Sequence, residues 1–247
     1  MVIFVTEKEE RKRLIEYLNY KDILIILFSW YLMIIGILIT KELDLKHEFL
    51  TELFHFLFVI SGRFILFSLL IFYLTSLYPV EFKDLGLDFG DFRKGILPAV
   101  SGAIILFILV IVFINIPLTY YFTENFSPLL KINELDNIVT SLLPFSLIFI
   151  ASTFISLSEQ FILNVVIFEL FNYTLFNRIV SFILSALLYS VLLVELRPER
   201  ILLNTLAAMI CLLLYWRKES IIPSTLFMAA YYSIYITYIY GFSFIRF

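Results

Sequence analysis

The sequence predicts an all-α fold, a polytopic transmembrane helical bundle with about seven spans, or eight if one ambiguous segment also crosses the membrane. The first observation is composition: hydrophobic residues make up 62% of the chain and charged residues 16%, against roughly 45–50% and 25% in soluble domains. The second is a series of apolar runs of about 20 residues, the length that crosses the hydrocarbon of a bilayer. The chain has 1 Cys, so no disulfide framework is expected.

The first 21 residues, 1–21, are charged, and we expect them to form a cytoplasmic amphipathic segment. A helix over 5–20, with Thr6 as its cap, either lies on the membrane surface or leads into the first span. The remainder, 22–247, is predicted to be a single transmembrane helical domain. Its predicted spans, each an apolar run between charged or turn residues, are 22–40, 52–77, 96–118, 138–158, 178–194, 199–216 and 221–240.

The segment 160–176 is apolar but carries Asn164, Glu169 and Asn172. It is therefore expected to be either an interfacial or re-entrant helix or an eighth span.

With seven spans, more lysine and arginine residues fall on the side of the membrane that holds the N-terminus than on the other side. Positively charged loops are retained in the cytoplasm. We therefore expect a multi-pass protein of the cell (plasma) membrane with its N-terminus in the cytoplasm. Glu159 is then expected at the cytoplasmic end of the fourth span. The net charge of −3 and the lack of a basic stripe exclude nucleic acid as a partner.

Three stretches of the C-terminal half follow one another in a suggestive order. The first is Glu159-Gln160-Phe161-Ile162-Leu163-Asn164. The second runs from Ser185 through Tyr189 to Leu193 in steps of four residues. The third is Ser220-Ile221-Ile222-Pro223, which is followed by Met228 and Tyr232. A weaker fourth stretch is Asp84-Leu85-Gly86-Leu87.

Together these stretches, over about 80–235, resemble the CPBP family of membrane proteins, which includes Rce1-type CAAX prenyl proteases and bacteriocin-processing proteins. The resemblance implies a CPBP-like helical core. In the family the first stretch reads Glu-Glu-x-x-x-Arg, the second ends in His, and the third is followed by His-x-x-x-Asn. Here only the first glutamate, Glu159, remains. The positions that lack the family's polar residues include Leu193, Met228 and Tyr232.

A metallopeptidase needs a carboxylate that activates water and imidazoles or equivalent ligands that hold a metal. The chain has 2 histidines, His47 and His55. We expect His47 in the first outer loop and His55 near the outer end of the second span, on the side opposite Glu159. Neither is expected to replace the missing ligands, so no metal site and no confident catalytic residue is predicted.

Ionisable side chains within membrane spans are costly and often functional. Arg63, Glu159 and Glu169 qualify. In one interpretation Glu159 is a vestigial catalytic carboxylate, with Gln160 and Asn164 as its hydrogen-bonding neighbours. In the other, Glu159 or Glu169 pairs with Arg63 as a polar brace between helices, and Gln160 and Asn164 form interhelical hydrogen bonds.

Three functions remain open. The first is a non-catalytic, CPBP-like subunit with a structural, assembly or binding role in a membrane protein complex. The second is a divergent CAAX-type endopeptidase that uses Glu159 and zinc, and the third is a transporter or channel component. The first predicts the lipid bilayer and other membrane proteins as partners and no cofactor.

Overall fold

The computed structural model describes residues 14–42, 48–88, 90, 92–109, 138–175, 177–192 and 198–240. All regular elements among these residues are helical, which confirms the predicted fold class. In chain order they are α1 (Leu14–Tyr17), α2 (Tyr20–Glu42), α3 (Glu48–Leu77), α4 (Phe92–Leu109), α6 (Ile138–Gln160), η4 (Phe161–Phe168), α7 (Glu169–Leu175), α8 (Arg178–Leu192), α9 (Pro198–Lys218) and α10 (Ile221–Tyr240).

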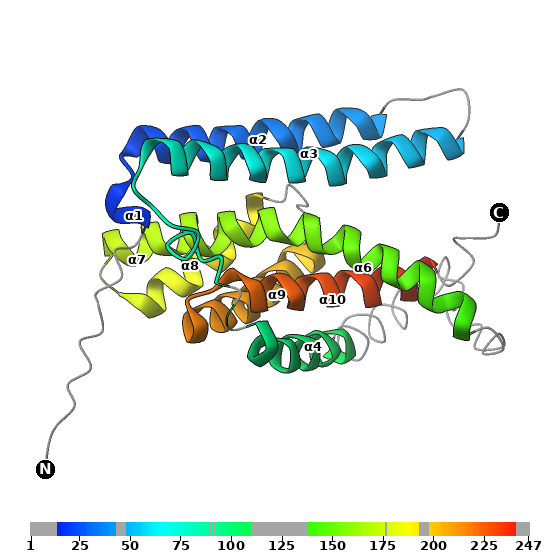
Figure 1. Cartoon of the computed structure of the whole chain (residues 1–247). Helices are drawn as coiled ribbons and strands as arrows, with labels where there is room; N and C mark the ends of the chain where they lie inside the picture. Colours follow the sequence, from blue (N-terminus) through cyan, green and yellow to red (C-terminus); the bar gives the residue numbers. More distant parts are fainter. Residues whose placement is uncertain are drawn as a thin grey trace, which may run out of the picture.

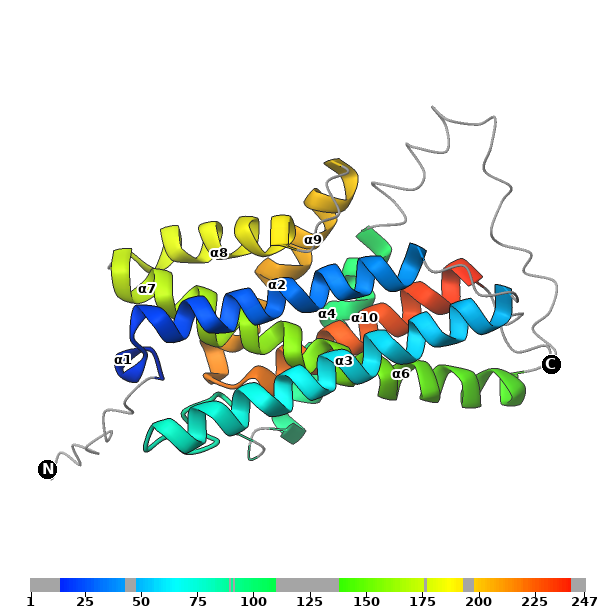
Figure 2. The same cartoon turned by 90° about the horizontal axis from the view of Figure 1, so that it is seen from above.

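The helices form layers around α6 and α10. Figure 1 shows α2 and α3 as a neighbouring pair on one side of α6, while α4 lies on the other side against α10. α10 packs against α4, α6 and α9, and α8 packs against α9. The long helices alternate in direction: α2, α4, α8 and α10 run away from α1, and α3, α6 and α9 run towards it (Figures 1 and 2).

Helix length and composition identify membrane-spanning candidates in the described part of the chain. Three helices are long and apolar enough to cross a membrane: Tyr20–Thr40, Leu57–Leu77 and Ser146–Leu175. Four shorter apolar helices are Gly95–Leu109, Arg178–Leu192, Ile201–Arg217 and Ile221–Ile234. Each of these segments overlaps one predicted span, although residues 110–118 of the third span lie outside the described residues. The outer surface is rich in exposed Leu, Ile and Phe, as expected where lipid is the solvent.

The predicted end of the fourth span was wrong. α6, η4 and α7 follow one another without a break, and Ser146–Leu175 is one apolar helix of 30 residues. Residues 160–175 therefore continue the same helix, and Glu159 lies within it instead of at its end. The polar residues that suggested a boundary, including Glu159 and Asn164, are buried among protein partners, so the helix does not have to end where they occur.

The segment η4, which follows Glu159 directly, is π-helical, and all 8 of its residues are buried. A helix that is apolar on all sides is expected where neighbours surround it. η4 contacts α6, α7, α8, α9 and α10. Because π-helical segments shift the register of side chains along a helix, η4 sets how the polar residues on either side of it face the bundle.

A polar cluster joins the start of α2 to the end of α3. The side chain of Asn19 accepts hydrogen bonds from the backbone N–H groups of Lys21 and Asp22 at 2.9 and 3.2 Å, which caps α2. The carboxylate of Asp22 accepts hydrogen bonds from the hydroxyls of Tyr73, at 2.8 Å, and Tyr78. The bond to Asp22 raises the pKa of Tyr78 to about 12. Of the helix predicted over 5–20, the described part contains α1, and a break at 18–19 separates it from α2.

Two of the sequence stretches that resembled a family meet in space. Gly86 has φ 74°, and its carbonyl accepts a hydrogen bond from the backbone N–H of Ile221 at 2.9 Å. The hydroxyl of Ser220 donates to the carbonyl of Asp88 at 3.1 Å. The Leu85-Gly86-Leu87 loop is therefore fastened to the start of α10.

Replacing Gly86 with alanine is expected to lower the free energy of unfolding by about 1–2 kcal/mol, because L residues with side chains are disfavoured in the left-handed region. A Cβ atom at this position would also lie 3.2 Å from Cγ2 of Ile221 and 3.4 Å from Cγ2 of Val165. Reversible unfolding of the full chain in bicelles measures the change. An unfolding free energy equal to that of the unmodified chain would contradict this role of Gly86.

Candidate functional site

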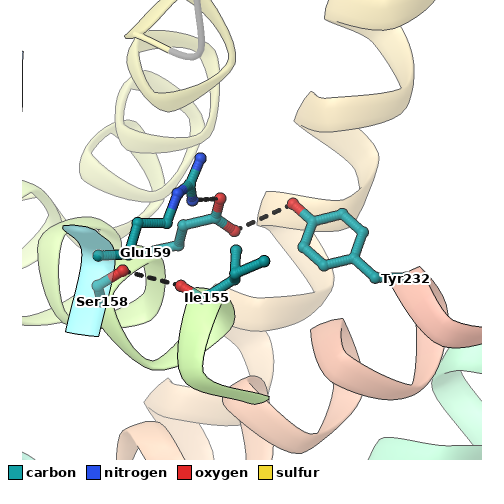
Figure 3. Close-up of polar contacts among 5 residues, drawn as sticks. Ile155, Ser158, Glu159 and Tyr232 are labelled. Atoms are coloured by element: carbon teal, nitrogen blue, oxygen red, sulfur yellow. Dashed lines mark hydrogen bonds and ion pairs between the residues drawn. The ribbon is translucent and has the colours of Figure 1, made fainter. Parts of the chain in front are cut away.

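The one carboxylate that remains from the first family-like stretch, Glu159, is 2% exposed and lies at the centre of a polar cluster. Its Oε1 atom forms an ion pair with Nη1 of Arg63 from α3. Its Oε2 atom accepts a hydrogen bond from the hydroxyl of Tyr232 in α10 at 3.0 Å. Figure 3 shows the Tyr232 hydroxyl and the Glu159 carboxylate pointing towards each other. Both carboxylate oxygens therefore have partners from other helices.

The guanidinium of Arg63 has a second contact, with Trp30 of α2. Its Cζ atom lies 5.4 Å from the centroid of the Trp30 ring, within the range of a cation–π interaction. Trp30 is 1% exposed. The brace cluster, defined as Trp30, Arg63, Glu159 and Tyr232, thus connects α2, α3, α6 and α10.

A second set of polar side chains lies one turn further along. Nδ2 of Asn164 donates hydrogen bonds to Oε1 of Gln160 at 3.0 Å and to Oγ of Ser224 at 3.1 Å. The hydroxyl of Ser224 donates to the carbonyl of Ile221 at 2.9 Å. The thiol of Cys211 lies 3.9 Å from the carbonyl oxygen of Ser224. Asn164 therefore bonds to Gln160 within its own helix and to Ser224 of α10, and the bond to Ser224 is an interhelical hydrogen bond of the expected kind.

The family-like positions that lack the expected polar residues differ in their surroundings. Met228 is 3% exposed within the hydrophobic core. Tyr232, which stands where the family has asparagine, presents a hydroxyl to Glu159. Leu193 lies outside the described residues.

The other sequence candidates do not join the brace cluster. Glu169 is buried at the start of α7, whereas the partner of Arg63 is Glu159. His55 lies in α3, but its side chain is outside the described part, as is the whole of His47. Among the side chains that the structure describes, no three His, Cys, Asp or Glu residues gather as metal ligands.

The groups around Glu159 do not fit zinc, which the family resemblance brings with it. Zinc is held by imidazole, thiolate or carboxylate ligands arranged around the ion. Here the nearest partner of the carboxylate is the guanidinium of Arg63, a cation with donors only. A metal ion at Glu159 would be repelled by Arg63.

Trp30 and Tyr189 were not found from the sequence as parts of the site. Trp30 lies in an apolar run, and aromatic residues in spans are usually lipid-facing or packed. Tyr189 is 1% exposed on α8 and belongs to the buried core. Its place in the second family-like stretch, four residues after Ser185, was the available signal.

Replacing Tyr232 with phenylalanine is expected to lower the free energy of unfolding by about 1.5 kcal/mol, the lower end for a hydrogen bond to a charged group, since Arg63 still neutralises Glu159. Unfolding of the full chain in lipid measures the change. Replacement of the exposed Tyr31 by phenylalanine is the control and should leave stability within about 0.5 kcal/mol. Equal effects of the two substitutions would show that the bond to Glu159 contributes nothing.

Comparison with known proteins yields one family. The family model described as type II CAAX prenyl endopeptidase Rce1-like matches residues 141–234. The match covers η4, α7, α8, α9 and most of α6 and α10, and over these residues it confirms the resemblance stated from the sequence. Trp30 and Arg63 lie outside the matched residues, whereas Glu159 and Tyr232 lie inside them. No curated protein and no solved structure shows a significant match.

Proposed function

We propose, from the match of residues 141–234 to an Rce1-like family model, that this part of the chain is non-catalytic and that the protein serves as a structural, assembly or binding subunit of a membrane protein complex. The observation that carries the proposal is the occupation of both oxygens of Glu159, by Arg63 and by Tyr232. A general base must accept a proton from water within hydrogen-bond reach. Glu159 is instead paired with the guanidinium of Arg63, which lies outside the matched residues. Such a pairing suits a structural role for the carboxylate.

Further support comes from what the neighbouring positions do. Met228 packs in the hydrophobic core, and Gln160 and Asn164 bond to each other. An endopeptidase would need these positions to bind a metal or to stabilise the charge that develops on the scissile carbonyl. In this chain Met228 instead packs in the core, and Asn164 joins η4 to α10 through Ser224.

The proposed orientation places the N-terminus in the cytoplasm of a multi-pass protein of the cell membrane. Lys21 lies at the start of α2, Lys83 in the loop that follows α3, Arg178 at the start of α8 and Arg217 near the end of α9. The alternating helix directions bring these helix ends to one end of the bundle (Figure 1). The positive-inside rule favours that end as cytoplasmic. A cysteine introduced at Lys83, in a Cys211→Ser background, should react with an impermeant maleimide only after the inner face is opened.

Peptidase activity is tested with the full chain and Glu159→Gln in lipid nanodiscs, on a farnesylated peptide that ends in a CAAX sequence. We expect no cleavage above the protein-free blank for either chain. Cleavage by the unmodified chain that Glu159→Gln abolishes would overturn the proposal and favour a divergent endopeptidase.

The subunit role is tested by native mass spectrometry after gentle solubilisation from native membranes. The expected result is a complex that contains a second membrane protein in fixed stoichiometry, and this complex should persist in Glu159→Gln. A chain that elutes alone under several mild detergents would overturn the subunit role while leaving the absence of cleavage as a separate result.

A further inference from the structure

Two arginines lie at the end of the bundle where α8 begins and α9 ends. Arg178 is the first residue of α8, and Arg217 is in the last turn of α9. The two helices pack against each other. Cζ of Arg178 lies 5.5 Å from the centroid of the Trp216 ring, within the range of a cation–π interaction. Because Trp216 directly precedes Arg217 in the chain, this contact brings the two arginines to one part of the surface.

The start of α8 and the Trp216 ring are both held in place by the protein. Oδ1 of Asn177 caps α8 by accepting hydrogen bonds from the backbone N–H groups of its second and third residues, at 3.1 and 3.2 Å. The Trp216 ring also packs against the ring of Phe182 in α8, with 6.3 Å between the centroids. The backbone of Arg178 and the ring that its guanidinium contacts are therefore ordered before any ligand binds.

Both guanidinium groups are available to an anion. Arg178 and Arg217 are exposed, and among the side chains that the structure describes neither forms an ion pair. Lys218 follows Arg217, and Glu219 is the one acidic residue within 177–180 and 215–219. The sequence here is therefore net positive. Arginine matches the geometry of phosphate oxygens, to which it donates two parallel hydrogen bonds.

An apolar surface begins next to these arginines. On α8, Ile179 is 65% exposed and Ile183 is 43% exposed, and on α9 Leu213, one turn before Arg217, is 43% exposed. These side chains belong to apolar helices of the bundle, and exposed apolar residues there face lipid. A ligand that contacts both the arginines and this surface needs an anionic group and hydrocarbon chains, which a phospholipid has and a soluble anion lacks.

We propose that Arg178, Trp216 and Arg217 form a binding site for the headgroup of an anionic phospholipid at the membrane surface. The two guanidinium groups donate hydrogen bonds to the phosphate, and the Trp216 ring orients Arg178. The acyl chains lie along the exposed apolar residues of α8 and α9. Phosphatidylcholine fits less well, because its choline group brings a further positive charge to the two arginines. Such a site is compatible with either orientation of the chain and does not require catalysis, since phospholipid phosphates line both surfaces of a bilayer.

The first test is native mass spectrometry of the full, delipidated chain in detergent, titrated with phosphatidylglycerol. We expect Arg178→Gln and Arg217→Gln each to weaken binding of the first lipid about fivefold, the usual contribution of a basic residue at an anionic membrane surface. Lys21→Gln removes an exposed cation at the start of α2. This variant is the matched control and should leave binding unchanged. Equal losses in the three variants would show that overall charge attracts the lipid, and would overturn the proposal.

Two further ligands test the class of molecule on the unmodified chain. Phosphatidylcholine should bind more weakly than phosphatidylglycerol, and equal binding overturns the preference for an anionic headgroup. Glycerol phosphate, which carries the phosphate without acyl chains, should not displace phosphatidylglycerol when added in excess. Displacement would show that a soluble anion satisfies the arginines, and would overturn the assignment of the site to a lipid.

The second test uses the unmodified chain in bilayers and so does not depend on a variant that folds. The sequence has 2 Trp, of which Trp30 is 1% exposed, whereas Trp216 lies in the proposed site. In bilayers with equal amounts of phosphatidylglycerol and phosphatidylcholine, brominated acyl chains on phosphatidylglycerol should quench tryptophan fluorescence more than brominated chains on phosphatidylcholine. Equal quenching shows that the anionic lipid is not enriched beside Trp216, and overturns the proposal.

Discussion

Replacing Arg63 with methionine is expected to lower the free energy of unfolding by about 3–5 kcal/mol, the usual effect of removing one partner of a buried ion pair. Methionine preserves the length and apolar stem of arginine but leaves Glu159, which is 2% exposed, without its counter-charge. The cation–π contact with Trp30 is lost at the same time. Equilibrium unfolding in bicelles, followed by circular dichroism, measures the change.

The double substitution Arg63→Met with Glu159→Leu separates charge from packing. Replacing a buried ion pair by apolar residues of similar volume is often neutral or stabilising, so the double variant should recover most of the loss. Lys21→Met, which removes an exposed cation at the start of α2, is the control and should change stability by less than about 0.5 kcal/mol. If the double variant is as unstable as Arg63→Met, the ion pair is not the source of the effect.

Replacing Gly95 with alanine is expected to cost about 3 kcal/mol, near the upper end for overpacking a buried contact. A Cβ atom at this position would lie 2.7 Å from Cγ and 3.1 Å from Cβ of Pro223. Neither helix can yield easily, because the proline ring is rigid and α10 is fastened at its start to the Gly86 loop. The variant should unfold at lower denaturant and lose the packing of α4 on α10.

The control for this substitution is Gly62→Ala in α3. A Cβ atom at Gly62 meets no atom of the described residues within 4 Å, and alanine has a higher helix propensity than glycine. Gly62→Ala should therefore leave stability unchanged or raise it slightly. A loss at Gly62 equal to that at Gly95 would show that the cost comes from glycine flexibility and not from the contact with Pro223.

Arg63 and Glu159 could be singled out from the sequence because charged residues are rare in apolar runs. Their pairing could not be deduced, since Glu169 was an equal candidate and about 15 Å of helix separates it from Glu159 at 1.5 Å per residue. The choice depends on how far α3 is displaced along α6, and hydropathy carries no information on that displacement. The role of Trp30 depends on the same packing.

Helix positions were predicted well because an apolar run has a length that the membrane dictates. The continuation of α6 into η4 was not predicted, because Glu159, Gln160 and Asn164 are polar residues of the kind that usually mark the end of a membrane span. Their neighbours from α3, α8 and α10 turn these side chains into interior contacts. Likewise, Gly86 could be recognised as part of a motif, but its bond to Ile221 joins segments far apart in the sequence.

The separation of 96 residues between Arg63 and Glu159 has a consequence for biogenesis. At a synthesis rate of about 5–20 residues per second, α3 leaves the ribosome roughly 5–20 s before its acidic partner does. During that interval the guanidinium of Arg63 is within an inserting hairpin, where an unpaired charge costs about 2.5–3.5 kcal/mol at the centre of a span. Trp30 belongs to that same hairpin and stacks on Arg63, so α2 can shelter the charge until α6 arrives.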